Sequence, residues 1–377
     1  MFNWIKKTIK KILLLLPTKN IVLFESHPDC TGNTKAVFDE MIRRGYNSKY
    51  KMIWLLQTSD PKDHNRLPNV RYYKDGNRIY VAYCRAKLFI SENCYFSKTR
   101  AHGQYALHIF HGGALKDVRA YYRVPEDIDE IITESPFLLE LDAKNNSCRK
   151  EILNPLGFPR NDVLLGVKAE IDKLFKGHDF KKMIYWMPTF RQHKTNSSLS
   201  HSSISIPIIH DEKTVGQINR KAQEYGVLIV VKPHPAQDIS MVKSMQLSNL
   251  LFIDDTFLSK QKVSNYELLA GADALLTDYS SVYYDYLLTN RSIGLCWEDY
   301  DEYKKREGFI IDTDIMMAGG EKIYTADDLC GFIERVGKGI DLLYEKRTEI
   351  RNLIFPPPVE PCTGKVVDRI DEILINL

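Results

Sequence analysis

Short apolar runs that alternate with helical patterns are the feature that most constrains this chain. From residue 18 on, runs long enough for buried strands are separated by segments with helical periodicity, which is typical of βαβ units and parallel sheets. The first series of expected strands covers residues 20–26, 50–57, 87–93, 107–113 and 129–135. The second series covers residues 183–190, 227–235, 250–256, 274–281 and 292–297. The pattern predicts an α/β protein with doubly wound, Rossmann-type sheets.

Two series of strands imply two domains, because 377 residues exceed what one ordinary core accommodates. A segment rich in Pro and Gly, Ile152–Asp162, precedes the second series and suits a crossover between domains. We therefore expect an N-terminal domain over residues 18–165 and a C-terminal domain over residues 166–377, facing each other across a cleft. Helices are expected at residues 211–225, 325–348 and 364–377.

The composition excludes several classes of protein. Hydrophobic residues at 44%, charged residues at 27% and a mean hydropathy of -0.31 exclude a polytopic membrane protein. A net charge of +3 is far from the basic excess of a nucleic-acid-binding face, so no nucleic-acid partner is expected. The seven cysteines form no C-x-x-C pair, and neither a disulfide framework nor a zinc site is predicted. A reducing compartment is indicated.

Residues 1–17, MFNWIKKTIKKILLLLP, have a basic amphipathic pattern. At about 100° per residue, apolar side chains share one face and lysines the other. The apolar run is too short for a signal peptide or a membrane-spanning helix. The favoured interpretation is a helix lying in an anionic membrane surface, since Trp4 and the lysines suit lipid headgroups. Docking of this helix on the protein's own core is the alternative.

The block ALLTDYSS offers a site for a phosphate at the end of a strand. The apolar run Ala274–Thr277 leads to Asp278, and Ser280 and Ser281 stand where a helix is expected to begin. Exposed amides and the helix dipole attract anions at such a point, and serine hydroxyls add donors. Simple helix capping by Asp278 or Ser280 is the alternative reading.

Two further strand ends carry groups that suit phosphate chemistry. In VVKPHP, two prolines fix the backbone around His234, which follows Lys232. In MPTFRQ, Thr189 and Arg191 follow a strand, and the guanidinium is a fork for phosphate oxygens. A surface histidine and a solvated loop arginine are the alternatives.

The stretch LHIFHGGALKD places a histidine directly after an apolar strand. His111 is followed by Gly112 and Gly113, which let a substrate approach the backbone, and by Lys116. A neutral histidine near pH 7 can accept a proton from an attacking hydroxyl. The chain holds no Walker-type or G-x-G-x-x-G loop, which argues against a P-loop or an ordinary dinucleotide site.

Taken in order, these motifs resemble the CDP-glycerol glycerophosphotransferase family, the teichoic-acid primases and polymerases of bacterial envelopes. The resemblance covers almost the whole chain after residue 18. It rests on KNIVLFES, HGGALK, GFPRND, MPTFR, VKPHP, LLTDYSSVYYDYLLTNRSI and DYDEYKKREGFIID. It implies a GT-B-type fold, an acceptor-binding N-terminal domain at the cytoplasmic face of the membrane, and a C-terminal domain that binds CDP-glycerol.

The resemblance also implies roles for single residues. His111 matches the base in the family's HGTPLK motif, and it would deprotonate an acceptor hydroxyl that attacks CDP-glycerol and displaces CMP. His234 and Asp278 are the other expected catalytic residues. The expected substrate-binding residues are Gly112, Gly113, Lys116, Thr189, Arg191, Lys232, Ser280 and Ser281. No metal and no cofactor beyond the CDP-glycerol donor is expected, and the expected acceptor is a lipid-linked saccharide.

Some positions depart from the family's pattern. Gly113 and Ala114 replace Thr and Pro, and residues 317–320 read MAGG where a Pro-Gly-Pro turn is typical. A CDP-ribitol or other nucleotide-activated donor therefore stays open, as does a non-catalytic, membrane-bound scaffold. A primase is slightly favoured over a polymerase of teichoic acid or a related capsule polymer, since the chain has little room for a further domain.

Overall fold

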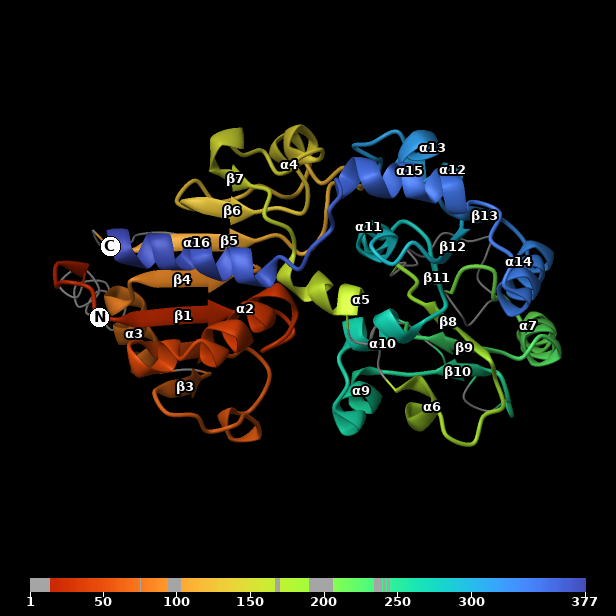
Figure 1. The fold of residues 1–377 in the computed structure, drawn as a ribbon, viewed down its shortest axis with the longest axis horizontal. Coiled ribbons are helices and arrows are strands. Elements are labelled where there is room, and N and C mark those ends of the chain that lie inside the picture. The colour runs from red at the N-terminus through yellow and green to blue at the C-terminus, as the bar shows by residue number, and fades with distance from the viewer. Residues whose placement is uncertain are drawn as a thin grey trace, which may run out of the picture. The chain divides into compact units, whose positions relative to one another are not determined.

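The computed structural model describes residues 14–74, 76–93, 103–166, 170–189, 206–233, 239, 242 and 245–377. These residues form two compact α/β units, each built on a parallel sheet (Figure 1). The first unit holds the described residues up to Gly113, together with Val118–Asp162 and Glu360–Leu377. The second holds Ala114–Asp117 and Val163–Val359. The prediction of two parallel-sheet α/β domains is confirmed.

The first unit is built on a sheet with strand order β3-β2-β1-β4-β5-β6-β7, in which all adjacent strands are parallel. Its strands are β1 (Ile21–Glu25), β2 (Lys51–Leu55), β3 (Val70–Tyr73), β4 (Leu88–Ser91), β5 (Tyr105–Ile109), β6 (Glu130–Ile132) and β7 (Leu153–Asn154). Its helices are α2 (Gly32–Arg43), α3 (Asn77–Arg85), α4 (Leu139–Asn145) and α16 (Thr363–Asn376). The order reverses between β1 and β4, where ligands bind in open α/β sheets.

Helix α16 completes the core of the first unit. It packs beside α2 on one face of the sheet (Figure 1), and its buried side chains, Val366, Val367, Ile370, Ile373 and Leu374, join the cluster formed by the strands. This differs from the predicted division, which assigned all of residues 166–377 to the second domain, because Glu360–Leu377 belongs to the first unit. The reason is physical: the apolar face of α16 is buried against the first sheet.

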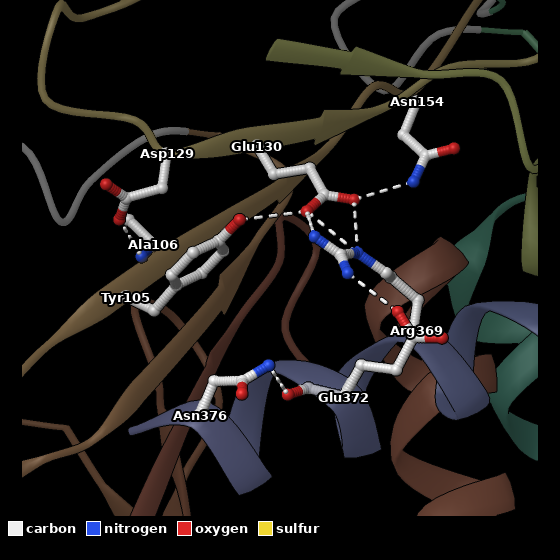
Figure 2. Close-up of polar contacts among 8 residues, drawn as sticks. All are labelled: Tyr105, Ala106, Asp129, Glu130, Asn154, Arg369, Glu372 and Asn376. Carbon is white, nitrogen blue, oxygen red and sulfur yellow. Dashed lines mark hydrogen bonds and ion pairs between the residues drawn. The ribbon is translucent and has the colours of Figure 1, made fainter.

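A polar network fastens α16 to the strands (Figure 2). The Arg369 guanidinium donates to Glu130, with Nη2 at 2.8 Å from Oε2. Tyr105 Oη and Asn154 Nδ2 also donate to this carboxylate, at 2.8 and 2.7 Å. Burial alone would raise the pKa of Glu130, but the bonds from Arg369, Asn154 and Tyr105 hold it below its ordinary value.

The second unit has strand order β10-β9-β8-β11-β12-β13, again with parallel neighbours. Its strands are β8 (Lys182–Trp186), β9 (Val227–Val231), β10 (Leu250–Phe252), β11 (Ala274–Thr277), β12 (Ser292–Cys296) and β13 (Glu321–Ile323). Its helices are α5 (Val163–Gly166), α6 (Ile171–Leu174), α7 (Glu212–Glu224), α9 (Asp255–Gln261), α10 (Asn265–Gly271), α11 (Val282–Leu287), α12 (Tyr300–Arg306), α13 (Thr313–Met316), α14 (Ala326–Lys338) and α15 (Tyr344–Ile354). Here the order reverses between β8 and β11.

The helix expected over residues 325–348 is divided. Helix α14 ends at Lys338, and Gly339 then takes a left-handed conformation with φ of 70°. Glycine is the usual residue for this way of ending a helix, so α15 starts anew at Tyr344. The amphipathic helix expected over residues 1–17 lies mostly outside the described residues. Within the described ranges, no helix is both long enough and apolar enough to cross a bilayer.

Candidate functional site

At the reversal point of the first sheet, a carboxylate covers the start of α2. Glu92 follows β4, is buried, and accepts hydrogen bonds from the backbone amides of Asn33 and Thr34. Gly32 precedes them with φ of 67°, and a Cβ there would lie 2.6 Å from Oε2 of Glu92. Burial raises the pKa of Glu92 to about 7, although the charge of Arg160 and the two amides act against it. A side chain thus occupies the place where an anionic ligand binds in many such sheets.

The two histidines of LHIFHGG have different environments. His108 lies within β5 and is fully buried, and burial lowers its pKa to about 3, so it stays neutral at physiological pH. His111 lies two residues beyond the end of β5 and is exposed. Only His111 therefore has the position of a histidine that can meet a substrate.

Hydrogen bonds from two side chains to backbone carbonyls fix the turn that carries His111. Asn33 Nδ2 donates to the Phe110 carbonyl at 2.9 Å, and Arg160 Nη2 donates to the His111 carbonyl at 2.7 Å. The backbone amide of Arg160 in turn donates to Asn33 Oδ1 at 3.0 Å. The start of α2 and the two segments that follow β5 and β7 are therefore held together at this edge of the sheet.

The remainder of the HGGALK motif divides between the units. Gly112 and Gly113 belong to the first unit, whereas Ala114–Asp117 clusters with the second. Lys116 forms an antiparallel bridge with Phe309, and its ammonium lies 5.6 Å from the centre of the Tyr303 ring. Within the second unit, the Ile310 amide also donates to the Leu115 carbonyl at 3.0 Å.

At the reversal point of the second sheet, Asp278 holds the loop after β8. Its fully buried carboxylate accepts from the Thr189 amide at 3.0 Å, and from the Thr189 hydroxyl. It also accepts from the Tyr279 amide at 2.7 Å. These bonds give Asp278 the environment of a residue that orients a loop rather than that of an exposed acid or base.

Ser280 and Ser281 stand before α11, and both are half-buried. Ser281, the N-cap residue, makes no side-chain cap to this helix, whereas Ser280 Oγ accepts a hydrogen bond from the Val282 amide at 3.4 Å. Every side chain of α11 is buried, so the start of this helix is anchored in the core of the second unit. The two serines are thereby presented at the carboxyl end of β11.

Lys232 follows β9, which neighbours β8 on the side opposite β11. Its Nζ lies 2.9 Å from Asp255 Oδ1, in an ion pair with the first turn of α9. The backbone amide of Lys232 donates to the Trp186 carbonyl at 2.9 Å, which continues the pairing of β8 and β9. His234 and Arg191, the other groups expected at these strand ends, lie outside the described residues.

The structure therefore brings Thr189, Asp278 and the two serines to one edge of the second sheet, and His111 to the corresponding edge of the first. Sequence reasoning missed Asn33, Glu92 and Arg160. The available signals were the glycine at the start of α2 and the arginine in the GFPRND motif. Among the described side chains, no group of three or more His, Cys, Asp or Glu residues could hold a metal ion.

Comparisons with known proteins identify relatives along nearly the whole chain. The sequence profile of the family described as CDP-Glycerol:Poly(glycerophosphate) glycerophosphotransferase matches residues 8–371. The teichoic acid poly(ribitol-phosphate) polymerase of Bacillus spizizenii (strain ATCC 23059 / NRRL B-14472 / W23) is 24% identical, with alignment over 95% of this chain and 60% of that protein. The teichoic acid glycerol-phosphate primase of Bacillus subtilis (strain 168) is also 24% identical, over 88% of this chain and 85% of that protein.

A solved structure shares the fold. The structure of the wall teichoic acid polymerase TagF superposes with a TM-score of 0.75 at 19% identity and covers 100% of this chain and 98% of that chain. The predicted GT-B-type fold is confirmed by this likeness. The first of the curated relatives extends well beyond the aligned region, since the chain spans three fifths of its length.

Proposed function

Because the chain belongs to the CDP-glycerol:poly(glycerophosphate) glycerophosphotransferase family, we propose that it transfers glycerol phosphate from CDP-glycerol to a hydroxyl of a membrane lipid-linked saccharide or polyol-phosphate acceptor. CMP is released, and the product belongs to teichoic acid or a related envelope polymer. The observation that carries this proposal is the family match over residues 8–371.

In the proposed reaction, His111 is the general base. Its imidazole takes the proton of the acceptor hydroxyl, whose oxygen forms a bond to the phosphorus that bears glycerol. The bond between this phosphorus and the bridging oxygen of the pyrophosphate breaks, and CMP leaves with the electron pair. The exposure of His111 at the carboxyl end of β5 supports this role.

The donor pyrophosphate is proposed to bind at the carboxyl ends of β8, β9 and β11. Ser280 and Ser281 supply donors, and His234 and Arg191 would stabilise the charge that develops on the leaving group. We assign Asp278 a positioning role, because its carboxylate is occupied with Thr189 and Tyr279. Gly112 and Gly113 are proposed to flank the acceptor beside His111, and Lys116 and Lys232 are proposed to bind substrate in the second unit.

An assay of CMP release tests the activity. We expect turnover of CDP-glycerol with a lipid-linked disaccharide acceptor, and a loss of 10²-fold or more, on the order of the usual general-base contribution, in His111→Gln. His178→Gln is the matched control, because His178 precedes β8 and lies at the opposite, amino end of the second sheet. No turnover with any CDP-polyol, with intact lipid binding, would support a scaffold instead.

The comparison with relatives favours one alternative to CDP-glycerol as the donor. One relative is named a poly(ribitol-phosphate) polymerase, so CDP-ribitol is the second candidate donor. A thermal-shift panel of CDP-glycerol, CDP-ribitol and UDP-sugars separates them, since a ligand stabilises the native state by mass action. Mass spectrometry of the product then counts the added units; a single unit is expected for a primase, which we slightly favour.

Residues 1–17 are proposed to bind an anionic membrane surface and hold the protein at the cytoplasmic face of the membrane. The described end of this segment supports the proposal, because Leu15 is 85% exposed and Leu16 is 41% exposed. Fractionation of the protein with and without residues 1–17 tests it. Equal partition of both forms into the soluble fraction would rule out this membrane contact.

A further inference from the structure

We propose that Asn33 and Arg160 are positioning residues that hold the His111 turn in the orientation that catalysis requires. This inference rests on the proposed function, in which His111 takes a proton from the acceptor. Neither residue needs to touch a substrate for this role, because each acts through a hydrogen bond to the backbone at Phe110 or His111.

Asn33 joins two loops through one side chain. Its carboxamide is fully buried, so each of its hydrogen bonds is protected from water. Nδ2 donates to the carbonyl of Phe110, the residue before His111, and Oδ1 accepts from the Arg160 amide. A carboxamide can donate from its nitrogen to one segment and accept at its oxygen from another.

Arg160 completes the arrangement from the other side. Its guanidinium donates to the His111 carbonyl at 2.7 Å and lies 5.5 Å from the centre of the Phe158 ring. The contact to the ring limits the directions that the guanidinium can take. The carbonyls of the two peptide bonds that flank the His111 Cα are therefore both hydrogen-bonded, which fixes the point from which the imidazole projects.

The start of α2 gives this assembly a rigid base. Asn33 lies in the first turn of α2, where its own amide is bonded to the buried carboxylate of Glu92. Gly32 allows the close approach of this carboxylate, as a Cβ would clash with it. The side chain of Asn33 is thus attached to an element that is fixed at the reversal point of the sheet.

The expected size of the effect follows from geometry. A displacement of about 1 Å of a reacting group costs on the order of 10²-fold in rate. Arg160→Met removes the donor to the His111 carbonyl and keeps most of the side-chain volume, so we expect kcat to fall about 10²-fold. The KM values for CDP-glycerol and for the acceptor are expected to stay close to those of the native protein.

Arg160→Lys and Arg66→Met are the companion variants. Lysine can restore one donor to the His111 carbonyl, so we expect it to recover part of kcat and to fold even if Arg160→Met does not. Arg66 is an exposed arginine of the first unit, and its replacement is expected to leave kcat unchanged. A raised KM for the acceptor with an unchanged kcat would overturn the inference, because it would make Arg160 a substrate contact.

A measurement without turnover separates this inference from the proposed function. The imidazole resonances of the native protein, assigned with His111→Gln, are expected to shift or broaden at His111 in Arg160→Met and in Asn33→Asp, and to stay in place in Arg66→Met. Unchanged His111 resonances in both variants would overturn the positioning role. A native protein that releases no CMP, but shows these shifts, would instead reject the proposed function and keep the structural link.

Discussion

The buried carboxylate of Asp278 accepts a hydrogen bond from the backbone amide of Thr189, with Oδ2 at 3.0 Å from the nitrogen. This bond links the loop after β8 to the loop after β11, across the point where the strand order of the second sheet reverses. The carboxylate of Asp278 therefore helps to set the relative placement of the two loops that we propose for donor binding.

Asp278→Asn is expected to lower stability and donor affinity together. An amide nitrogen in place of Oδ2 would face the N–H of Thr189, so two donors would meet in a buried place and the new amide N–H would lack this carboxylate's bond. We expect a loss of about 1–3 kcal/mol in the free energy of unfolding and a higher KM for CDP-glycerol. Urea titration and CMP-release kinetics measure the two effects. Asp301→Asn, an exposed control, should change neither, and a native-like Asp278→Asn would contradict the assigned role.

Arg369→Met is expected to weaken the attachment of α16. The change leaves the Glu130 carboxylate buried without its guanidinium, at a cost of about 2–4 kcal/mol. Because the folded state lowers the pKa of Glu130, its contribution to stability is present above the ordinary pKa and is lost as the pH falls. The urea midpoints of the native protein and of Arg369→Met should therefore differ at neutral pH and converge at acidic pH. Lys365→Met, which disrupts an exposed pair with Glu360, should have a midpoint near that of the native protein.

Gly32→Ala should cost more than Gly45→Ala. Both glycines have positive φ, 67° and 78°, so both substitutions strain the backbone. A Cβ at position 32 also meets the Glu92 carboxylate at 2.6 Å, whereas nothing lies within 4 Å of one at position 45. We expect thermal unfolding to show the larger loss for Gly32→Ala. Equal losses would mean that the Glu92 contact is easily relieved.

Glu92→Gln is expected to change how stability depends on pH. Folding raises the pKa of Glu92 from 4.5 to about 7, so the folded state binds its proton more tightly than the unfolded chain does. The free energy of unfolding should thus fall by up to about 3 kcal/mol as the pH rises from about 4.5 to 7. Other groups titrate in this range, so the quantity to compare is the difference between native and Glu92→Gln proteins. A difference that is constant with pH would contradict the raised pKa.

The strands were the part of the fold that the sequence predicted best. Buried parallel strands are continuous apolar runs, such as Val227–Val231, and these are visible without any partner. The position of α16 could not be predicted, because an apolar helix face does not say which sheet covers it. Likewise, the end of α14 depends on the left-handed conformation of Gly339, which the periodicity of the flanking residues hides.

The candidate site was predictable only where a residue follows an apolar run. His111, Asp278 and the two serines were found in this way. Asn33 and Arg160 were not, because 127 positions separate them and their contact exists only once the sheet has formed. For Asp278, the position was predicted but the role was not. A carboxylate at the end of a strand suggests a catalytic residue, whereas the structure shows that it accepts hydrogen bonds from Thr189 and Tyr279.

The return of α16 to the first unit has a consequence for how the protein is made. Synthesis proceeds from the N-terminus, and domains generally fold as their residues emerge. The first sheet is complete once residue 154 has been made, but α16, which packs beside α2 on one face of this sheet, begins at Thr363. The whole second unit is therefore synthesised while the part of this face that α16 covers is exposed, and transiently exposed apolar surface makes a partly folded domain prone to aggregation.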